Sequence, residues 1–278
     1  LPISVISNGA GPTALVMAGN HGDEYEGQIG LSRLIRNLQP KDIRGCVIVL
    51  PMTNFPAAMA GWRTSPLDSG NLNRMFPGDP DGSPTEMIAH YVETVLMPMC
   101  DGMLDLHSGG RTLHYVPSAL MIADAGAEPD PKTLAAMKAF GAPIAYITAT
   151  GDSRTSLAGA IRQGVVAIGT ELGGTGQVTR ETIRVAEAGI ANFLAYFGVT
   201  ERSNAEPQPA SRVMRVEGHH YYVYASTRGW FEPFFDLGDT VSKGQDAGLI
   251  HFLDEPLREL VPVKFDHGGL VICRRPPV

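Results

Sequence analysis

Residues 13–24 read TALVMAGNHGDE and decide the fold around them. The first six residues form an apolar run that predicts a buried strand, and the stretch that follows the motif has helical spacing of apolar residues. His21 and Glu24 therefore stand where a strand gives way to a helix. Gly19 and Gly22 allow the chain to turn there, because glycine tolerates positive φ. A histidine and a carboxylate on such a turn can bind one metal ion.

The spacing His-x-x-Glu is a weak pattern by itself. A helix-start cap with a solvated acid is the alternative interpretation. His107, in the segment DLHSGG at residues 105–110, favours the metal, because it also follows an apolar run and precedes glycines. Two imidazoles and one carboxylate form a zinc site that keeps a fourth position for water.

Length, composition and charge narrow the class of protein. The chain has 278 residues, which predicts one large domain and one small one. Hydrophobic residues make up 44%, and no apolar run approaches the ~20 residues that span a bilayer. The net charge of -7 argues against a nucleic-acid partner. We therefore expect a small-molecule substrate, no nucleic acid and no membrane, with a homo-oligomer left open.

The cysteines carry information about the compartment. Cys46, Cys100 and Cys273 are scattered, which predicts free buried thiols and a reducing, cytoplasmic location. The chain begins at Leu1 without methionine, so a preceding segment is left open, and nothing at the start reads as a signal peptide.

Strand and helix patterns alternate through the first 197 residues, which is typical of an α/β fold with a largely parallel sheet flanked by helices. Strands are predicted at 13–18, 46–51, 102–106, 119–123, 143–149 and 165–170, and helices at 25–37, 83–96, 131–140, 156–162 and 179–197. Residues 52–83 predict a long loop. Four residues of buried type argue that this loop is ordered: Trp62, Leu72, Met75 and Phe76.

A change in the sequence pattern, from alternating strands and helices to short strands and turns, divides the chain. We expect a catalytic domain at 1–198, a polar linker with two prolines at 199–210, and a small β-barrel-like, all-β domain at 211–278. Strands within the small domain are expected at 221–224 and 260–263. Its turn at Lys243 is similar to turns of biotinyl and lipoyl barrels, but the flanking residues of a modified lysine are absent, so only the fold is inferred.

Three reactive side chains share one position in the pattern. His21, His107 and Glu171 each come at or just after the end of an apolar strand, and sites of open α/β sheets form at the carboxyl ends of strands. Glu171 is therefore the expected acid beside the metal, where zinc would lower the pKa of water toward ~7 and a carboxylate could take its proton. Asp105 either orients His107 or is a buried acid at a strand end.

Four segments now identify a family resemblance: GNHGDEYEG, NLNRMFPG, DLHSGG and TELGG. Together they resemble the succinylglutamate desuccinylase/aspartoacylase family, whose catalytic domain is similar to the zinc carboxypeptidases. The resemblance implies one zinc ion per chain, bound by His21, Glu24 and His107, with Glu171 as general base and acid.

The resemblance also implies roles for three polar residues. Asn73 and Arg74 would bind the carboxylate of the substrate, and Arg63 would polarise the scissile carbonyl. The chemistry agrees, because a guanidinium matches a carboxylate in two-point fashion and can stabilise an oxyanion. From the residues alone, an ordinary surface arginine remains the alternative for Arg63.

Other candidates have two interpretations each. His114 and Tyr115 either line the pocket or are structural. His219 and His220 either form a second metal site or are exposed turn residues.

The leading functional hypothesis is a zinc amidohydrolase that removes a small acyl group, most simply acetyl, from an N-acyl amino acid. The branch of the family that the chain resembles acts on N-acetyl-2,4-diaminobutyrate. The alternative is a carboxypeptidase-type metallopeptidase acting on short peptides. A regulatory or carrier module that merely binds a metal is disfavoured, since it would not need Glu171 as a base.

Overall fold

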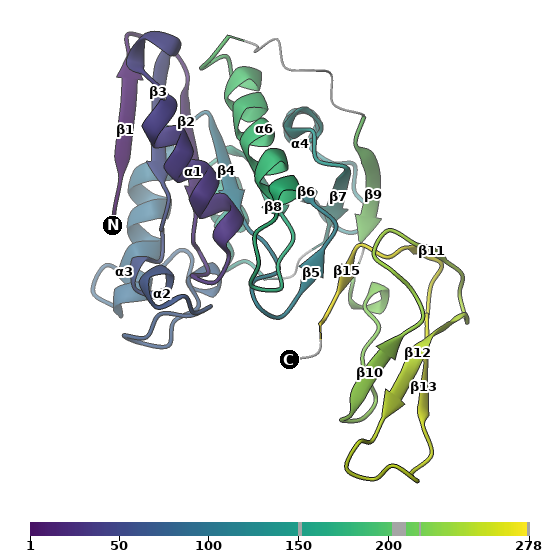
Figure 1. The fold of residues 1–278 in the computed structure, drawn as a ribbon. Coiled ribbons are helices and arrows are strands. Elements are labelled where there is room, and N and C mark those ends of the chain that lie inside the picture. Colours follow the sequence, from purple (N-terminus) through teal and green to yellow (C-terminus); the bar gives the residue numbers. More distant parts are fainter. Residues whose placement is uncertain (150–151, 202–209, 217, 277–278) are drawn as a thin grey trace.

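The computed structural model describes residues 1–149, 152–201, 210–216 and 218–276. Its centre is an eight-stranded mixed sheet with the strand order β1-β3-β2-β4-β8-β6-β7-β9 (Figure 1). The strands are β1 (Ser4–Asn8), β2 (Thr13–Ala18), β3 (Gly45–Leu50), β4 (Gly102–Leu106), β6 (Ser118–Ile122), β7 (Ile144–Thr148), β8 (Val166–Glu171) and β9 (Arg212–Val216). All six strands that the sequence predicted for this region are confirmed.

The directions of the strands bring three strand ends together. β3, β2, β4 and β8 run parallel to one another, whereas β1 pairs antiparallel with β3 and β6 antiparallel with β8. The neighbours β2, β4 and β8 end at residues 18, 106 and 171. Their carboxyl ends therefore form one continuous rim, as the sequence predicted.

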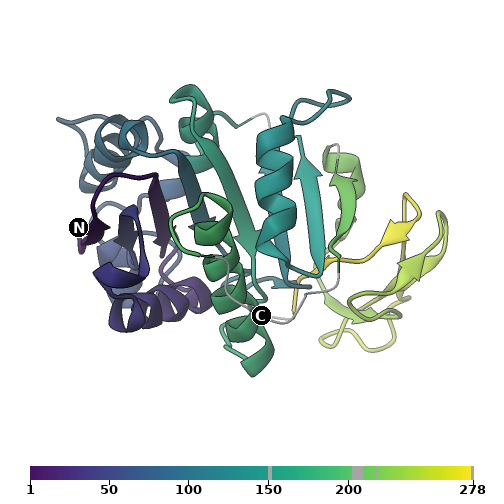
Figure 2. The same ribbon diagram turned by 90° about the horizontal axis from the view of Figure 1, so that it is seen from above.

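Helices cover both faces of the sheet (Figures 1 and 2). They are α1 (Tyr25–Asn37), α2 (Phe55–Ala60), α3 (Pro84–Tyr91), α4 (Pro131–Phe140), α5 (Ser156–Arg162) and α6 (Arg180–Tyr196). Short 3-10 helices are η1 (Pro40–Asp42), η2 (Leu72–Arg74) and η4 (Met97–Met99), and η3 (Val92–Leu96) is a π-helix that continues α3. One core lies against α1, α4 and α6, and a second lies against α3 and α5. Strands buried on both faces explain the continuous apolar runs in the sequence.

The stretch 52–83 is ordered but is more than a loop, because it contains α2 and η2. Leu72 and Phe76 are completely buried in the second core, which anchors the segment. The expectation that Trp62 is buried is wrong, since 56% of it is exposed. Its main chain holds it instead, through the carbonyl that accepts a hydrogen bond from Gly22 N.

The C-terminal region forms smaller sheets beside the large one (Figure 1). β10 (Trp230–Pro233), β12 (Asp246–His251) and β13 (Val261–Lys264) make a three-stranded sheet, β11 (Thr240–Val241) pairs with β14 (Gly269–Leu270), and β15 (Cys273–Arg274) pairs with β5 (His114–Tyr115). The predicted strand at 260–263 is confirmed as β13. A strand at 221–224 is wrong, because the chain forms the turn η5 (His219–Tyr221), where the ring of Tyr221 stacks on His267.

The predicted linker lies largely outside the described residues, which leave out 202–209. β9 follows it in the sequence and pairs with β7 at the edge of the large sheet. No helix in the described part of the chain is long and apolar enough to cross a membrane.

Candidate metal centre and active site

The loop between β2 and α1 turns as the sequence predicted. Its two glycines, Gly19 and Gly22, are needed for different reasons. Gly19 has φ +71°, a conformation that favours glycine. Gly22 does not have a positive φ and is needed for space, since a Cβ there would lie 2.0 Å from the carbonyl oxygen of Ala57. The expectation of positive φ at Gly22 is therefore wrong. This close approach packs α2 against the loop.

The loop brings the predicted metal ligands together. His21 Nδ1 lies 2.7 Å from Glu24 Oε1, and His107 Nδ1 lies 2.8 Å from Glu24 Oε2. Potential ligand atoms of the three residues lie within 4.8 Å of one another. His21 and Glu24 are each 3% exposed, so water cannot readily replace these contacts. Two imidazoles and a carboxylate meeting in a buried place are a donor set that suits zinc.

The outer nitrogen of each histidine also has a partner. His21 Nε2 lies 3.0 Å from Asn71 Oδ1, and His107 Nε2 lies 3.0 Å from Asp105 Oδ2. These oxygens can accept a hydrogen bond from an Nε2–H group, and in that tautomer Nδ1 is the nitrogen that can bind a metal. Such outer contacts orient metal-binding histidines in proteins. The side chains therefore fit a zinc ion in type and in the outer contacts that orient them.

Asp105 is itself held in place. It is completely buried, and its Oδ2 accepts hydrogen bonds from Asn20 Nδ2 at 2.8 Å and Ser156 Oγ at 2.5 Å. This supports the interpretation that it orients His107. Asn71 was missed from the sequence, where nothing but its place within the NLNR segment marks it.

Charges in the cluster act on each other. Burial alone would raise the pKa of Glu24, but His21 and His107 outweigh it and hold the pKa well below its usual range. Burial would lower the pKa of His107, but the carboxylates of Asp105 and Glu24 raise it well above the usual value. A carboxylate that stays ionised between two imidazoles can bind a metal cation.

Glu171 lies at the end of β8, beside β4, the strand that ends just before His107. Burial, and secondly the charge of Glu24, raise its pKa well above the usual value. Within the described part of the chain, its buried Oε2 has no hydrogen-bond partner. A carboxyl group with an elevated pKa and one free oxygen is suited to taking up and releasing a proton.

The predicted substrate residues lie around this cluster. Arg63 Nη1 is 3.3 Å from Glu24 Oε1, and its side chain is 46% exposed. Asn73 Nδ2 lies 3.4 Å from His107 Nε2, while its Oδ1 accepts a hydrogen bond from Ser156 N.

Arg74 is farther out. It donates to the carbonyl of Asn73, and its Nε lies 3.2 Å from Asp152 Oδ2. The structure thus places Arg63 in contact with Glu24 and Asn73 in contact with His107. Arg74 contacts Asn73 and Asp152 instead.

Of the other candidate residues, one lies near Glu171 and three histidines lie in the C-terminal turn or on the β5–β15 ladder. Tyr115 is close to Glu171, since burial and then the charge of Glu171 raise the pKa of its phenol. His114 pairs with Arg274 across the β5–β15 ladder. His219 and His220 lie in η5, and the described residues contain no cluster of three metal-ligating groups there. Sequence reasoning missed three residues near Glu171 that come from distant segments: Tyr146, Tyr222 and Cys273.

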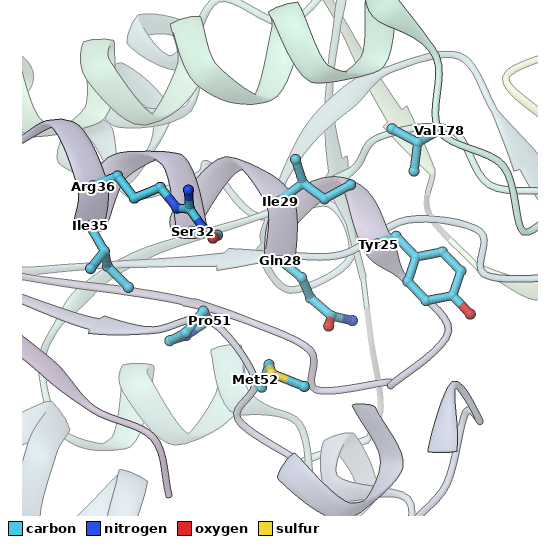
Figure 3. Close-up of a pocket in the computed structure, with 9 residues that line it drawn as sticks. All are labelled: Tyr25, Gln28, Ile29, Ser32, Ile35, Arg36, Pro51, Met52 and Val178. Atoms are coloured by element: carbon cyan, nitrogen blue, oxygen red, sulfur yellow. The ribbon is translucent and has the colours of Figure 1, made fainter. Parts of the chain in front are cut away.

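A hollow of about 430 Å³ lies along α1 (Figure 3). Its lining is mainly apolar and comes from α1 and from Pro51, Met52 and Val178. Gln28, which lines it, donates to the carbonyls of Gly22 and Glu24. None of the candidate metal-ligand side chains lines the hollow, so it is not the candidate reaction site.

Residues 10–197 match the succinylglutamate desuccinylase/aspartoacylase catalytic domain. The chain belongs to the succinylglutamate desuccinylase/aspartoacylase family. This agrees with the resemblance inferred from the four sequence segments.

Similar proteins extend the match over the whole chain. The N-alpha-acetyl-L-2,4-diaminobutyric acid deacetylase of Halomonas elongata is 43% identical over 280 residues, which cover 100% of this chain and 81% of that protein. A succinylglutamate desuccinylase/aspartoacylase from Rhodobacter sphaeroides is 39% identical, with a TM-score of 0.91 over 99% of this chain and 84% of the other.

The product-bound ectoine utilization protein EutE (DoeB) of Ruegeria pomeroyi is 38% identical, with a TM-score of 0.93 over the same shares. The fold of the small C-terminal region is therefore shared with these proteins along with the catalytic part.

Proposed function

We propose that the protein is a zinc-dependent deacylase that hydrolyses the amide bond of a small N-acetyl amino acid. The observation that carries the proposal is the buried cluster of His21, Glu24 and His107 with the free carboxyl oxygen of Glu171 on the adjacent strand end. The relative from Halomonas elongata supports N-acetyl-2,4-diaminobutyrate as the substrate to test first.

The proposed chemistry divides among few residues. A zinc ion bound by His21, Glu24 and His107 would act as a Lewis acid toward a carbonyl and would acidify water. Glu171 would take the proton of the attacking water and deliver it to the departing amine. The free oxygen of Glu171 favours uptake of the proton from water. The raised pKa of Glu171 favours holding that proton until it is delivered to the amine.

Three polar side chains around the cluster would position the substrate: Arg63, Asn73 and Arg74. Arg63, which touches Glu24, would stabilise the negative charge that develops on the scissile carbonyl oxygen. Arg74 and Asn73 would bind the carboxylate of the amino acid. A fixed carboxylate places the amide in register with the metal, which lowers the barrier by orientation.

Zinc, the small-molecule substrate and the cytoplasmic location belong to this proposal. Free Cys46, Cys100 and Cys273 support a reducing compartment. The division into a catalytic domain, a linker and a small domain also stays a proposal.

The first experiment measures metal and substrate range together. Purified protein should contain one zinc per chain, and it should release acetate from N-acetyl-2,4-diaminobutyrate faster than it cleaves short peptides. His107→Ala should lose both zinc and turnover. His251→Ala, which removes a partly exposed histidine paired with Glu232, is the matched control and should keep both. Stoichiometric zinc in His107→Ala would refute the ligand set, and preferential cleavage of peptides would favour the carboxypeptidase alternative.

A further inference from the structure

Glu26 is a buried acid for which the proposed mechanism has no use. It lies in the first turn of α1, two residues after Glu24, and only 1% of it is exposed. An acid in the first turn can stabilise a helix from the surface. Burial beside two other carboxylates, Glu24 and Glu171, is unfavourable, so the helix alone does not account for this position.

The carboxylate of Glu26 reaches the loop that carries the proposed base. Its Oε1 accepts a hydrogen bond from Gly174 N at 3.2 Å, three residues after Glu171. Gly173 is equally close, because a Cβ on it would lie 3.1 Å from the same oxygen. Glu26 therefore joins the helix after the metal loop to the segment after β8.

Both ends of this connection are firmly packed. The next helical residue, Gly27, lies so close to the ends of β2 and β4 that a Cβ would meet Leu106 at 2.5 Å and Ala18 at 2.9 Å. At the other end, the carbonyl of Gly173 accepts hydrogen bonds from Gly109 N and Tyr115 N. The side chain of Glu26 adds a direct hydrogen bond between these two packed segments.

We propose that Glu26 is a positioning residue that fixes the Glu171 loop relative to the metal ligands through its hydrogen bond to Gly174 N. The inference rests on the proposed function, because it concerns the placement of the proposed base. The acting feature is an acceptor oxygen at the right place, so a glutamine at position 26 can supply it. A side chain of similar size without an acceptor cannot.

The test compares Glu26→Met with Glu26→Gln in the full-length zinc-loaded protein. Glu26→Met should lower kcat for N-acetyl-2,4-diaminobutyrate on the order of 10- to 100-fold, because misplacement of a reacting group has that effect. Its KM and zinc content should stay unchanged, and amide hydrogens of residues 172–176 should exchange faster. Glu26→Gln should stay close to the wild type in all four measurements.

Glu93→Gln is the matched control. Glu93 is 2% exposed and pairs with Arg162, away from the metal loop, so its loss should lower the melting temperature without changing kcat or exchange at 172–176. Wild-type kcat in Glu26→Met, or a loss in Glu26→Gln as large as in Glu26→Met, would overturn the inference. If the wild type releases no acetate, the proposed function fails, and the exchange rates alone then decide whether the hydrogen bond fixes the loop.

Discussion

Glu24 contacts His21 and His107 with one carboxylate oxygen each, but the two histidines differ in the partner of their outer nitrogen. The far nitrogen of His21 meets the neutral amide of Asn71, whereas that of His107 meets the carboxylate of Asp105. A carboxylate partner makes an imidazole more basic than an amide partner does. His107 should therefore be the stronger donor of the two toward a metal.

The role of Glu171 is tested by its amide. Glu171→Gln should retain zinc and bind substrate normally, because Glu171 is not among the ligands. Turnover should fall by about 10²–10⁴-fold, the usual contribution of a general acid or base. Steady-state kinetics together with metal content check this, and near-normal kcat would remove Glu171 from the mechanism.

The same variant makes a prediction about pH in the protein stripped of metal by a chelator. Burial and Glu24 raise the pKa of Glu171 above its ordinary value of 4.5. A carboxyl whose folded pKa is raised contributes stability below the unfolded pKa, and this contribution is lost as the pH rises through the folded pKa. Glutamine does not titrate. The stability advantage of Glu171→Gln should therefore be small near pH 4.5 and grow with rising pH.

Urea unfolding of the two metal-free proteins at several pH values measures this difference. A constant advantage across the pH range would show that the carboxyl of Glu171 does not titrate abnormally.

At this scale, the sequence could predict the residues that carry the chemistry but not those that support them. His21, Glu24, His107 and Glu171 stand out because each comes at or near the end of an apolar run. Asn71 and Glu26 carry no such signal, since their roles depend on contacts with segments far away in the sequence.

At the scale of elements, the segment from Asn71 to Phe76 connects the second core with the candidate metal ligands His21 and His107. Leu72 and Phe76 are buried, and Phe76 N donates to the carbonyl of Arg154. Asn71, which directly precedes Leu72, lies against His21, and Asn73, between the two buried residues, lies against His107.

Arg74→Lys tests what this segment recognises. Lysine keeps the charge but lacks the planar fork, so KM for an N-acetyl amino acid should rise strongly while zinc is retained. Replacing the substrate carboxylate by an amide should harm the wild type far more than Arg74→Ala. Arg154→Lys is the control, because Arg154 pairs with the same Asp152 but is 63% exposed. Equal discrimination between acid and amide by wild type and Arg74→Ala would show that Arg74 does not read the carboxylate.

Elements were predictable where their residues repeat with a clear period. The central strands and the main helices of the large sheet follow their apolar patterns closely. The pattern failed at 221–224, where aromatic residues suggested a strand but the rings stack on one another instead. It also failed to place β9, because pairing with β7 depends on the partner strand and not on the local sequence.

For the whole molecule, the C-terminal region matters because it returns to the catalytic part. β15 pairs with β5, placing Cys273 opposite Tyr115, and Val116 N donates to the carbonyl of Ile272. Tyr115 N in turn donates to Gly173, close to Glu171. Burial raises the pKa of Cys273 to about 12, so a neutral thiol lies on this side of the site.

Deletion of residues 272–278 should therefore separate metal binding from catalysis. The proposed zinc ligands follow the ends of β2 and β4, whereas β15 pairs with β5, so zinc content should stay the same. β5 would lose its partner strand, and the loop after β8 would lose part of its support, so kcat/KM should fall by at least about tenfold through misplacement of Glu171. Leu257→Asp, at a completely exposed position of the same region, should change neither quantity. Full activity in the truncated chain would show that the C-terminal strand does not hold the catalytic loop, and loss of zinc would show that it supports the metal centre itself.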